Sequence, residues 1–319
     1  MAPPAARAIL IASGPWDPDE WAAAARAAEP DRPVFVWPDV PDKAAVGYAL
    51  AWSPPAGALA GLPNLKAIFS LGAGVDHLVF QPDLPDVPIV RVVDDDLTGR
   101  MTEWVILQVL LHHRQWHTYQ RQQAKRHWRE LDQPPAGAVR VGFMGLGAIG
   151  RASATVLAQI GFRVAGWSRR EQRFEGIETF AGLGLLDAFL ARTDILVSLL
   201  PLTPETRGIL SMPLFRKLAR DGALGAPVLI NAGRGGSQVE ADIIAALDEG
   251  ILGGASLDVF EVEPLPPTSR LWSHPNVVVT PHAAASSSPQ ALVPPMLRQI
   301  AAYEAGAPLE NVIDRNAAY

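Results

Sequence analysis

The sequence predicts an α/β protein with two doubly wound parallel-sheet domains. Short β-rich runs alternate with helical patterns along nearly the whole chain. The 319 residues also correspond to two domains of about 150 residues each. With 49% hydrophobic and 19% charged residues, the chain has enough apolar material for two cores.

Five apolar runs predict the strands of the first domain. They are Ala8–Ile11, Val34–Trp37, Val46–Trp52, Leu65–Ser70 and Pro88–Val93. An alanine-rich helix over about Trp21–Ala28 follows the first run, in the order that builds a parallel sheet. We place this domain at residues 1–93.

A long helical stretch, about Thr98–Trp128, opens the second domain. Its apolar residues recur every three to four positions and predict one buried face, made of Trp104, Leu107, Leu110 and Leu111. The part beyond Arg114 is polar and contains tryptophans. Two interpretations stay open for it, a solvated helix end and a dimerisation surface.

Six further runs predict the strands of the second sheet: Val139–Met144, Arg163–Trp167, Ile195–Leu199, Val228–Asn231, Gly254–Asp258 and Val277–Thr280. Helices are expected between most of them, including Ala148–Ile160, Met212–Arg220 and Val239–Asp248. We expect prolines 289, 294 and 295 to interrupt the chain before a final helix over Met296–Ala305. We place the second domain at residues 94–284 and expect 285–319 to complete the first.

A glycine-rich loop follows the first strand of the second domain. Gly145, Gly147 and Gly150 form G-x-G-x-x-G between an apolar strand and an alanine-rich helix, which is the context of a Rossmann dinucleotide site. The first glycine permits the tight turn, the second lets a pyrophosphate approach, and the third lets helix and strand pack. The helix N-terminus offers N–H groups to the phosphates.

The turn after the second strand of this domain predicts which nucleotide binds. An NAD site has an acidic residue there, about 20 residues past the loop, to hold the ribose 2′-hydroxyl. This chain has Ser168, Arg169 and Arg170 instead. A hydroxyl and a guanidinium suit a 2′-phosphate, so we expect NADP as cofactor, preferred as NADPH over NADH. The alternative is a solvated basic turn, with Glu171 or Glu175 holding the ribose.

Three polar motifs follow later strands of the same sheet, so they are expected to meet at its carboxyl edge. They supply Arg234, Glu263 and His282. Reduction of a 2-keto acid needs a hydride and a proton, and His282 is the natural proton donor near neutral pH. Glu263 would favour the imidazolium form, and Arg234 would bind the substrate carboxylate.

Several motifs together resemble the D-isomer-specific 2-hydroxyacid dehydrogenases. They are GLGAIG, LPLTPETRGIL, NAGRG, LDVFEVEPLP and HPNVVVTPH, within a resemblance that spans about Leu65–His282. The WSRR turn and residues 87–114 are most similar to the glyoxylate/hydroxypyruvate reductase A branch. The resemblance implies two Rossmann- or flavodoxin-like domains with the active site in the cleft between them, and a homodimer built through the cofactor domains.

The resemblance also implies roles for particular residues. Arg234, Glu263 and His282 become the catalytic set, and the backbone N–H groups of Ala73 and Gly74 hold the substrate carboxylate together with Arg234. The expected cofactor-binding residues are Gly145, Leu146, Gly147, Ala148, Ile149, Gly150, Ser168, Arg169, Arg170, Leu200, Pro201, Thr206, Ala232, Gly233 and Asp258. Trp37, Trp52 and Arg91 are candidates for the substrate side, although core packing is the favoured interpretation of each tryptophan.

Composition excludes several other classes of function. The chain has no cysteine, which removes disulfides, thiolate metal sites and cysteine nucleophiles. Its net charge of −6 gives no basic footprint for nucleic acid or an anionic membrane.

No apolar run approaches the roughly 20 residues of a membrane span, so we expect a cytoplasmic protein. His113 and His117 have metal-ligand spacing but lack the glutamate of H-E-x-x-H, so no metal is expected.

The leading hypothesis is therefore NADPH-dependent reduction of small 2-keto acids, glyoxylate and hydroxypyruvate, with His282 as general acid. One alternative is a nucleotide-sensing, corepressor-like binding protein of the same fold. Another is a 2-hydroxyacid dehydrogenase for a bulkier keto acid. Relatives that oxidise formate or phosphite would use NAD, and the turn at Ser168–Arg170 argues against them.

Overall fold

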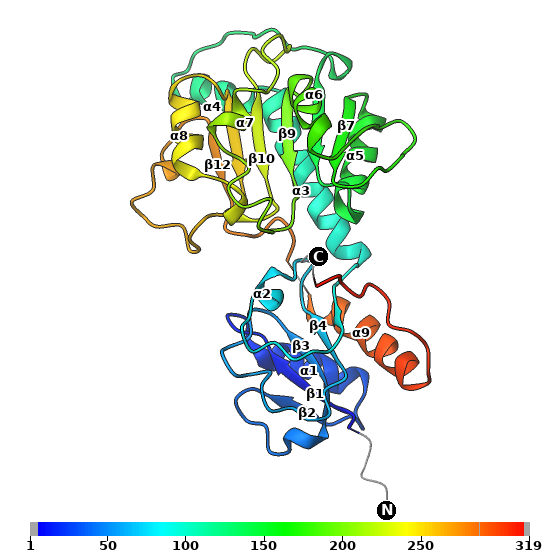
Figure 1. Ribbon diagram of the computed structural model, residues 1–319. Helices are drawn as coiled ribbons and strands as arrows, with labels where there is room; N and C mark the ends of the chain where they lie inside the picture. The colour runs from blue at the N-terminus through cyan, green and yellow to red at the C-terminus, as the bar shows by residue number, and fades with distance from the viewer. Residues whose placement is uncertain (1–5, 287, 316–319) are drawn as a thin grey trace, which may run out of the picture. The chain divides into compact units, whose positions relative to one another are not determined.

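The computed structural model describes residues 6–286 and 288–315 (Figure 1). Contacts within the chain divide it into two compact units. Unit 1 contains residues 6–96 and 288–315, and unit 2 contains Leu97–Ser286. The chain thus leaves unit 1 once and returns to it with its last helix. Each unit is built on a separate parallel sheet, as the sequence predicts.

Unit 1 has a five-stranded sheet in the order β2-β1-β3-β4-β5. The strands are β1 (Ala8–Ala12), β2 (Val34–Val36), β3 (Val46–Ala51), β4 (Ala67–Ser70) and β5 (Ile89–Val90). The helices are α1 (Pro18–Ala28), α2 (Asp76–Val79) and α9 (Pro289–Glu304). Strands β1, β3 and β4 are buried throughout, which matches their continuous apolar runs.

Unit 2 has a seven-stranded sheet in the order β12-β11-β10-β9-β6-β7-β8. Its strands are β6 (Arg140–Met144), β7 (Arg163–Ser168), β8 (Glu178–Ala181), β9 (Ile195–Ser198), β10 (Val228–Asn231), β11 (Gly254–Leu257) and β12 (Val277–Val279). Its helices are α4 (Trp116–Ala124), α5 (Ala148–Ile160), α6 (Leu186–Ala191), α7 (Met212–Phe215) and α8 (Glu240–Asp248), besides α3 (Asp95–His113), which begins at the boundary.

The prediction of one helix over Thr98–Trp128 is wrong. Helix α3 ends at His113, and α4 starts after Gln115, whose left-handed backbone (φ 54°) breaks the helical path. The buried face also differs from the predicted one, because residues 104, 105, 108, 109 and 112 face the core. Leu107 lies off this face with 53% of its surface exposed.

The prolines near the C-terminal end do not interrupt the chain as expected. Pro289 occupies the first turn of α9, where its fixed φ suits the helix and the missing N–H has no partner to lose. Pro294 and Pro295 lie inside the same helix. In Figure 1 this helix, coloured orange, packs beside the blue strands of unit 1, where Leu292, Val293 and Ile300 join the core. Burial of one helix face therefore outweighs the lost backbone hydrogen bonds.

In the described parts of the chain, no helix combines the length and the apolar character needed to cross a membrane.

Candidate functional site

The glycine loop lies between β6 and α5, and each glycine meets a different constraint. Gly145 has a positive φ of 101°, and a Cβ there would stand 3.0 Å from the Leu199 carbonyl oxygen. A Cβ on Gly150 would lie 2.1 Å from the Gly145 carbonyl oxygen. Nothing lies within 4 Å of the Cβ position of Gly147, so the backbone there is open to a ligand.

The loop sits where the strand order of unit 2 reverses. Strand β6 has β7 on one side and β9 on the other, so the chain leaves it in one direction and later returns on the opposite side. In open α/β sheets the ligand crevice forms at this switch point, beyond the carboxyl ends of the strands. Gly147 is the N-cap of α5 and no side chain caps this helix, so its first N–H groups remain available.

The other residues predicted in this loop divide between core and surface. Leu146 is buried, and a Cβ on Gly166 of β7 would stand 2.4 Å from its side chain. Ala148 and Ile149 begin helix α5 and are half-buried. Their backbone, rather than their side chains, therefore faces the phosphate position that the sequence predicts.

The basic turn after β7 exposes both arginines, Arg169 and Arg170. Ser168 is buried, and its hydroxyl donates to the Arg170 carbonyl oxygen at 2.7 Å. Its single proton therefore shapes the turn, whereas the sequence assigns that proton to a 2′-phosphate. The Thr203 hydroxyl and, more weakly, the charge of Arg169 lower the pKa of Glu205, so Arg169 lies near the loop that follows β9.

The loops after β9 and β10 lie against each other at the same sheet edge. Thr206 donates from its hydroxyl to the Pro201 carbonyl oxygen at 2.7 Å and accepts from the Thr203 N–H at 2.8 Å, which folds the first loop. Leu200 and Ala232 are buried, and a Cβ on Gly233 would stand 2.7 Å from the Leu200 carbonyl oxygen. The structure thus brings these predicted cofactor residues beside the glycine loop.

Arg234 follows β10 and is half-buried. Its Nη1 donates to the Gly233 carbonyl oxygen at 2.8 Å. The side-chain amide of Asn231 supports the same turn, because it accepts from the Gly233 N–H and donates to Gln238. The arginine is therefore held from a rigid strand end, and its guanidinium has the charge and the donor geometry to recognise an anion.

His282 and Glu263 form a hydrogen-bonded pair, with 2.7 Å between Nδ1 and Oε2. The His282 side chain is 42% exposed, and its bond to Glu263 uses Nδ1 and not Nε2. The other Glu263 oxygen accepts from the Phe260 N–H at 3.0 Å. Burial alone would raise the pKa of Glu263, but these hydrogen bonds and the charges of His282 and Arg234 lower it below its usual value. Arg234 and this pair are therefore close enough to interact.

Asp258 has a structural position that the sequence does not reveal. It is buried, and its carboxylate accepts from the Thr280 hydroxyl at 2.5 Å and from the N–H groups of Ala283 and Ala284. Its own carbonyl oxygen accepts from the His282 N–H at 2.8 Å. Asp258 was predicted to bind cofactor, whereas these bonds use its carboxylate to shape the turn that presents His282.

The predicted substrate loop follows β4 in unit 1. The Ser70 hydroxyl contacts the carbonyl oxygens of Gly72 and Gly74 at 2.8 and 3.0 Å, which curls the loop. Ala73 and Gly74 are half-buried. A Cβ on Gly72 would stand 2.3 Å from the Trp52 ring, which stacks on Trp16 with 4.7 Å between ring centroids. Trp52 thus packs against this loop.

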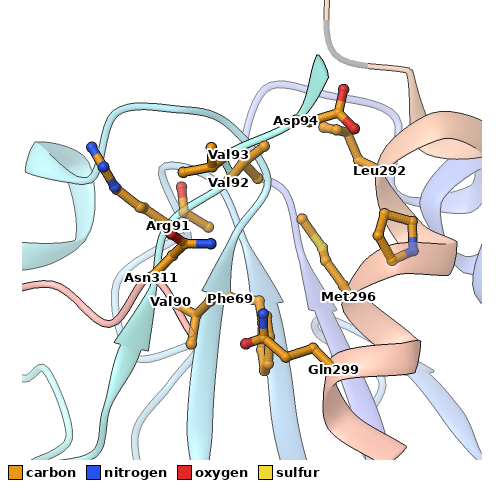
Figure 2. Close-up of a pocket in the computed structure, with 12 residues that line it drawn as sticks. Phe69, Val90, Arg91, Val92, Val93, Asp94, Leu292, Met296, Gln299 and Asn311 are labelled. Atoms are coloured by element: carbon orange, nitrogen blue, oxygen red, sulfur yellow. The ribbon is translucent and has the colours of Figure 1, made fainter. Parts of the chain in front are cut away.

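Unit 1 also contains a pocket between the edge of its sheet and α9, shown in Figure 2. Val90 and Val92 form one wall, and Met296 and Gln299 form the other. Arg91 contributes to the rim, but its guanidinium points away from α9. The pocket contains none of the predicted cofactor or catalytic residues.

The histidines on α3 and α4 pack against other side chains. The His113 ring packs edge-on against Phe162, and the His117 ring lies 5.4 Å from that of His112. In the core, His112 Nε2 donates to the Ser256 hydroxyl, whose own proton goes to Gln108. Among the described residues, no group of three metal-ligating side chains gathers anywhere.

Sequence reasoning missed three polar residues that shape the site. Gln238 is buried and donates to the Val259 carbonyl oxygen at 2.9 Å. Glu240 and Glu261 exchange hydrogen bonds with each other's backbone. The available signal was the clustering of polar residues just after two strands, but pattern alone does not say which of them pair.

The chain is similar to a protein family and to individual known proteins. Residues 106–284 match the family model for the D-isomer specific 2-hydroxyacid dehydrogenase, NAD binding domain. The chain is 40% identical to a glyoxylate/hydroxypyruvate reductase A from Serratia proteamaculans over 302 residues, which is 93% of this chain and 95% of that protein.

Solved structures are similar over nearly the full length. An NADPH-dependent glyoxylate/hydroxypyruvate reductase from Sinorhizobium meliloti, in complex with NADP and sulfate, superposes with a TM-score of 0.93 at 52% identity, covering 98% of this chain and 99% of that one. A D-isomer specific 2-hydroxyacid dehydrogenase from Xanthobacter autotrophicus, in complex with NADPH and MES, gives 0.93 at 42% identity, with 99% and 100% covered.

Proposed function

The chain belongs to the D-isomer specific 2-hydroxyacid dehydrogenase family, and from that premise we propose that it reduces small 2-keto acids with NADPH. Glyoxylate and hydroxypyruvate are the proposed substrates, and 2-hydroxy acids the products. The observation that carries the proposal is the His282–Glu263 pair at the carboxyl edge of the sheet that bears the glycine loop.

The residues of unit 2 suit a dinucleotide. Gly147 leaves open space beside an uncapped helix N-terminus, where a pyrophosphate can accept backbone hydrogen bonds. Arg169 is an exposed cation next to Ser168, the last residue of β7, where a carboxylate would favour NAD. The relatives from Sinorhizobium meliloti and Xanthobacter autotrophicus were solved with NADP and NADPH, which agrees with this preference.

When bound, NADPH supplies the hydride for the carbonyl carbon. His282 then gives the Nε2 proton to the carbonyl oxygen, so the ketone becomes a secondary alcohol. Glu263 holds Nδ1 and keeps the imidazole in the orientation that exposes Nε2. Arg234 binds the substrate carboxylate and polarises the carbonyl. We extend the proposal to Ala73 and Gly74, whose backbone N–H groups would donate hydrogen bonds to the substrate carboxylate.

A matrix of initial rates tests the proposed function. NADPH and NADH are each paired with glyoxylate, hydroxypyruvate, pyruvate and phenylpyruvate, and oxidation of the cofactor is followed by absorbance. We expect the highest kcat/KM when NADPH is paired with glyoxylate or hydroxypyruvate. No turnover with any pair would contradict the enzyme assignment and favour a nucleotide-sensing protein. A preference for phenylpyruvate would favour the bulkier-substrate alternative.

We also propose a homodimer formed through unit 2. Leu107 on α3 and Trp116 at the start of α4 are 53% and 48% exposed in the single chain. Trp128, beyond α4, is exposed over its whole surface. Large apolar side chains grouped on one segment are typical of an interface. A mass equal to one chain in size-exclusion chromatography with light scattering would contradict it.

A further inference from the structure

Two segments of unit 2 carry the proposed catalytic residues, and a series of contacts fixes how they align with each other. We call this series of contacts the ladder. One is 231–240, which includes Arg234, and the other is 258–263, which includes Glu263. The Asp258 N–H donates to the Asn231 carbonyl oxygen at 3.0 Å. Further along, the side-chain amide of Gln238 donates a hydrogen bond to the Val259 carbonyl oxygen at 2.9 Å. The distance between the arginine and the carboxylate therefore depends on this ladder.

The tight fit continues at Gly235. A Cβ at this position would stand 1.8 Å from the Phe260 carbonyl oxygen, so the two backbones touch where only glycine fits. Phe260 is also the residue whose N–H binds Glu263. Any shift of the second segment along the first would therefore move the carboxylate that holds His282.

The last contact of the ladder is a pair of reciprocal hydrogen bonds. The Glu240 N–H donates to Glu261 Oε1 at 2.7 Å, and the Glu261 N–H donates to Glu240 Oε1 at 2.7 Å. We call this pair the carboxylate clasp. Glu240 is the first residue of α8, and Val239 before it provides no side-chain cap. Glu261 thus caps the helix from a distant segment.

The clasp places two carboxylates side by side, which is electrostatically unfavourable. A serine at position 239 would cap α8 without a second negative charge. A local cap, however, would leave the 258–263 segment untied at its far end. What the clasp adds over an ordinary cap is therefore the connection between α8 and the segment that carries Glu263.

We propose that Glu240 and Glu261 are positioning residues for the reaction, which hold Glu263 where it orients His282. This inference rests on the proposed function. Neither glutamate touches the reacting atoms in this role. Their effect passes through the backbone of residues 260–263 to the carboxylate, and from it to the imidazole.

The test compares Glu261→Ala and Glu240→Ala with Glu261→Gln, in the full-length protein with NADPH and glyoxylate. The alanine variants lose an acceptor, whereas the glutamine keeps an oxygen that can accept from the Glu240 N–H. Glu249→Ala, at the other end of α8, is the matched control.

We expect the alanine variants to lower kcat about tenfold. The KM and the Kd for NADPH should stay within about twofold, because substrate and cofactor contacts are unchanged. Glu261→Gln and Glu249→Ala should resemble the wild type.

A second readout does not depend on activity. We expect the proton between His282 and Glu263 to give a downfield ¹H NMR resonance, which can be assigned by its loss in His282→Ala. We expect this resonance to broaden in the alanine variants and to persist in Glu261→Gln. Alanine variants with wild-type kcat and an unchanged resonance would overturn the inference, as would a Glu261→Gln variant as impaired as Glu261→Ala. A wild type without turnover but with the expected resonance changes would contradict the proposed function and leave the clasp supported.

Discussion

His282 has a backbone conformation that few residues other than glycine adopt, with φ at 53°. Such a conformation costs free energy and persists only where the surroundings hold it. Asp258 holds it here, since its carbonyl oxygen and its buried carboxylate accept hydrogen bonds from the backbone of residues 282–284. The result is an imidazole aimed at Glu263 from a rigid turn. At the scale of single residues, the site is built by backbone geometry as much as by side-chain chemistry.

Replacing His282 with alanine removes the proposed proton donor. We expect kcat to fall by about 100- to 10,000-fold, the usual contribution of a positioned general acid. The Kd for NADPH, measured by fluorescence titration, should change little because the glycine loop is untouched. His127→Ala, at an exposed histidine, is the control. Lost NADPH binding in His282→Ala would show that the residue is not the acid.

Arg169 is the residue expected to choose the cofactor. Arg169→Ala should raise the Kd for NADPH about tenfold or more, because a charge-assisted hydrogen bond to the 2′-phosphate is lost. The Kd for NADH, which has no such phosphate, should hardly change. Arg173→Ala provides a control, since Arg173 is exposed and paired with Glu171. Equal weakening of both cofactors by Arg169→Ala would exclude the 2′-phosphate assignment.

At the scale of elements, the sequence predicted the strands whose burial requires a clear run of apolar residues. Strand Val228–Asn231 is buried throughout because both faces of a parallel sheet are covered, and its bounds were predicted to the residue. Strand β8 was missed because Glu178–Ala181 is a half-buried edge strand with a weak apolar signal. The start of α9 was predicted too late because its prolines disfavour a helix, whereas tertiary packing overrides this local propensity.

The elements that carry the candidate site were predictable from the sequence, but its turn geometry was not. Arg234, Glu263 and His282 follow strand ends, and the topology alone brings them to one edge. The Ser168 bond to the Arg170 carbonyl and the role of Asp258 were not predictable, because both depend on turn geometry. The carboxylate clasp depends on the register between two segments, which no local pattern encodes.

Helix α3 is joined to β11 by a buried polar contact. His112 Nε2 lies 2.9 Å from the Ser256 hydroxyl, which also donates to Gln108. Burial, with a smaller contribution from the charge of His117, lowers the pKa of His112 to about 3. The folded protein therefore holds this histidine neutral at any pH well above 3.

This neutral histidine should make stability depend on pH. Below about pH 6.5 the unfolded chain takes up a proton that the folded state refuses, so the free energy of unfolding falls as pH falls towards 3. At pH 5 the contribution of His112 is about 2 kcal/mol. His112→Gln keeps a hydrogen-bonding group without titrating. Urea unfolding at pH 7.5 and 5 should therefore show a smaller loss in the variant. Parallel losses in both proteins would contradict this account.

At the scale of the whole molecule, the chain closes unit 1 with a helix that comes last in the sequence. Arg32, whose side chain is only 1% exposed, makes this closure. It donates to both carboxylate oxygens of Glu304 on α9 at 3.0 Å, and also to Glu29 and to the Arg7 carbonyl oxygen. A single guanidinium thus ties the N-terminal part of unit 1 to the returning helix.

Breaking this tie should destabilise unit 1 without affecting the cofactor site. Arg32→Met leaves Glu304 and Glu29 without their buried partner, and we expect a loss of about 2–4 kcal/mol in the free energy of unfolding. Arg7→Met is the matched control, because Arg7 lies 3.7 Å from the same Glu304 but is 59% exposed. Its loss should stay below about 1 kcal/mol, since water screens an exposed pair. Urea unfolding followed by tryptophan fluorescence measures both, and NADPH titration should give unchanged Kd values because unit 2 carries the glycine loop. Equal losses in the two variants would mean that the buried position of Arg32 does not secure the returning helix.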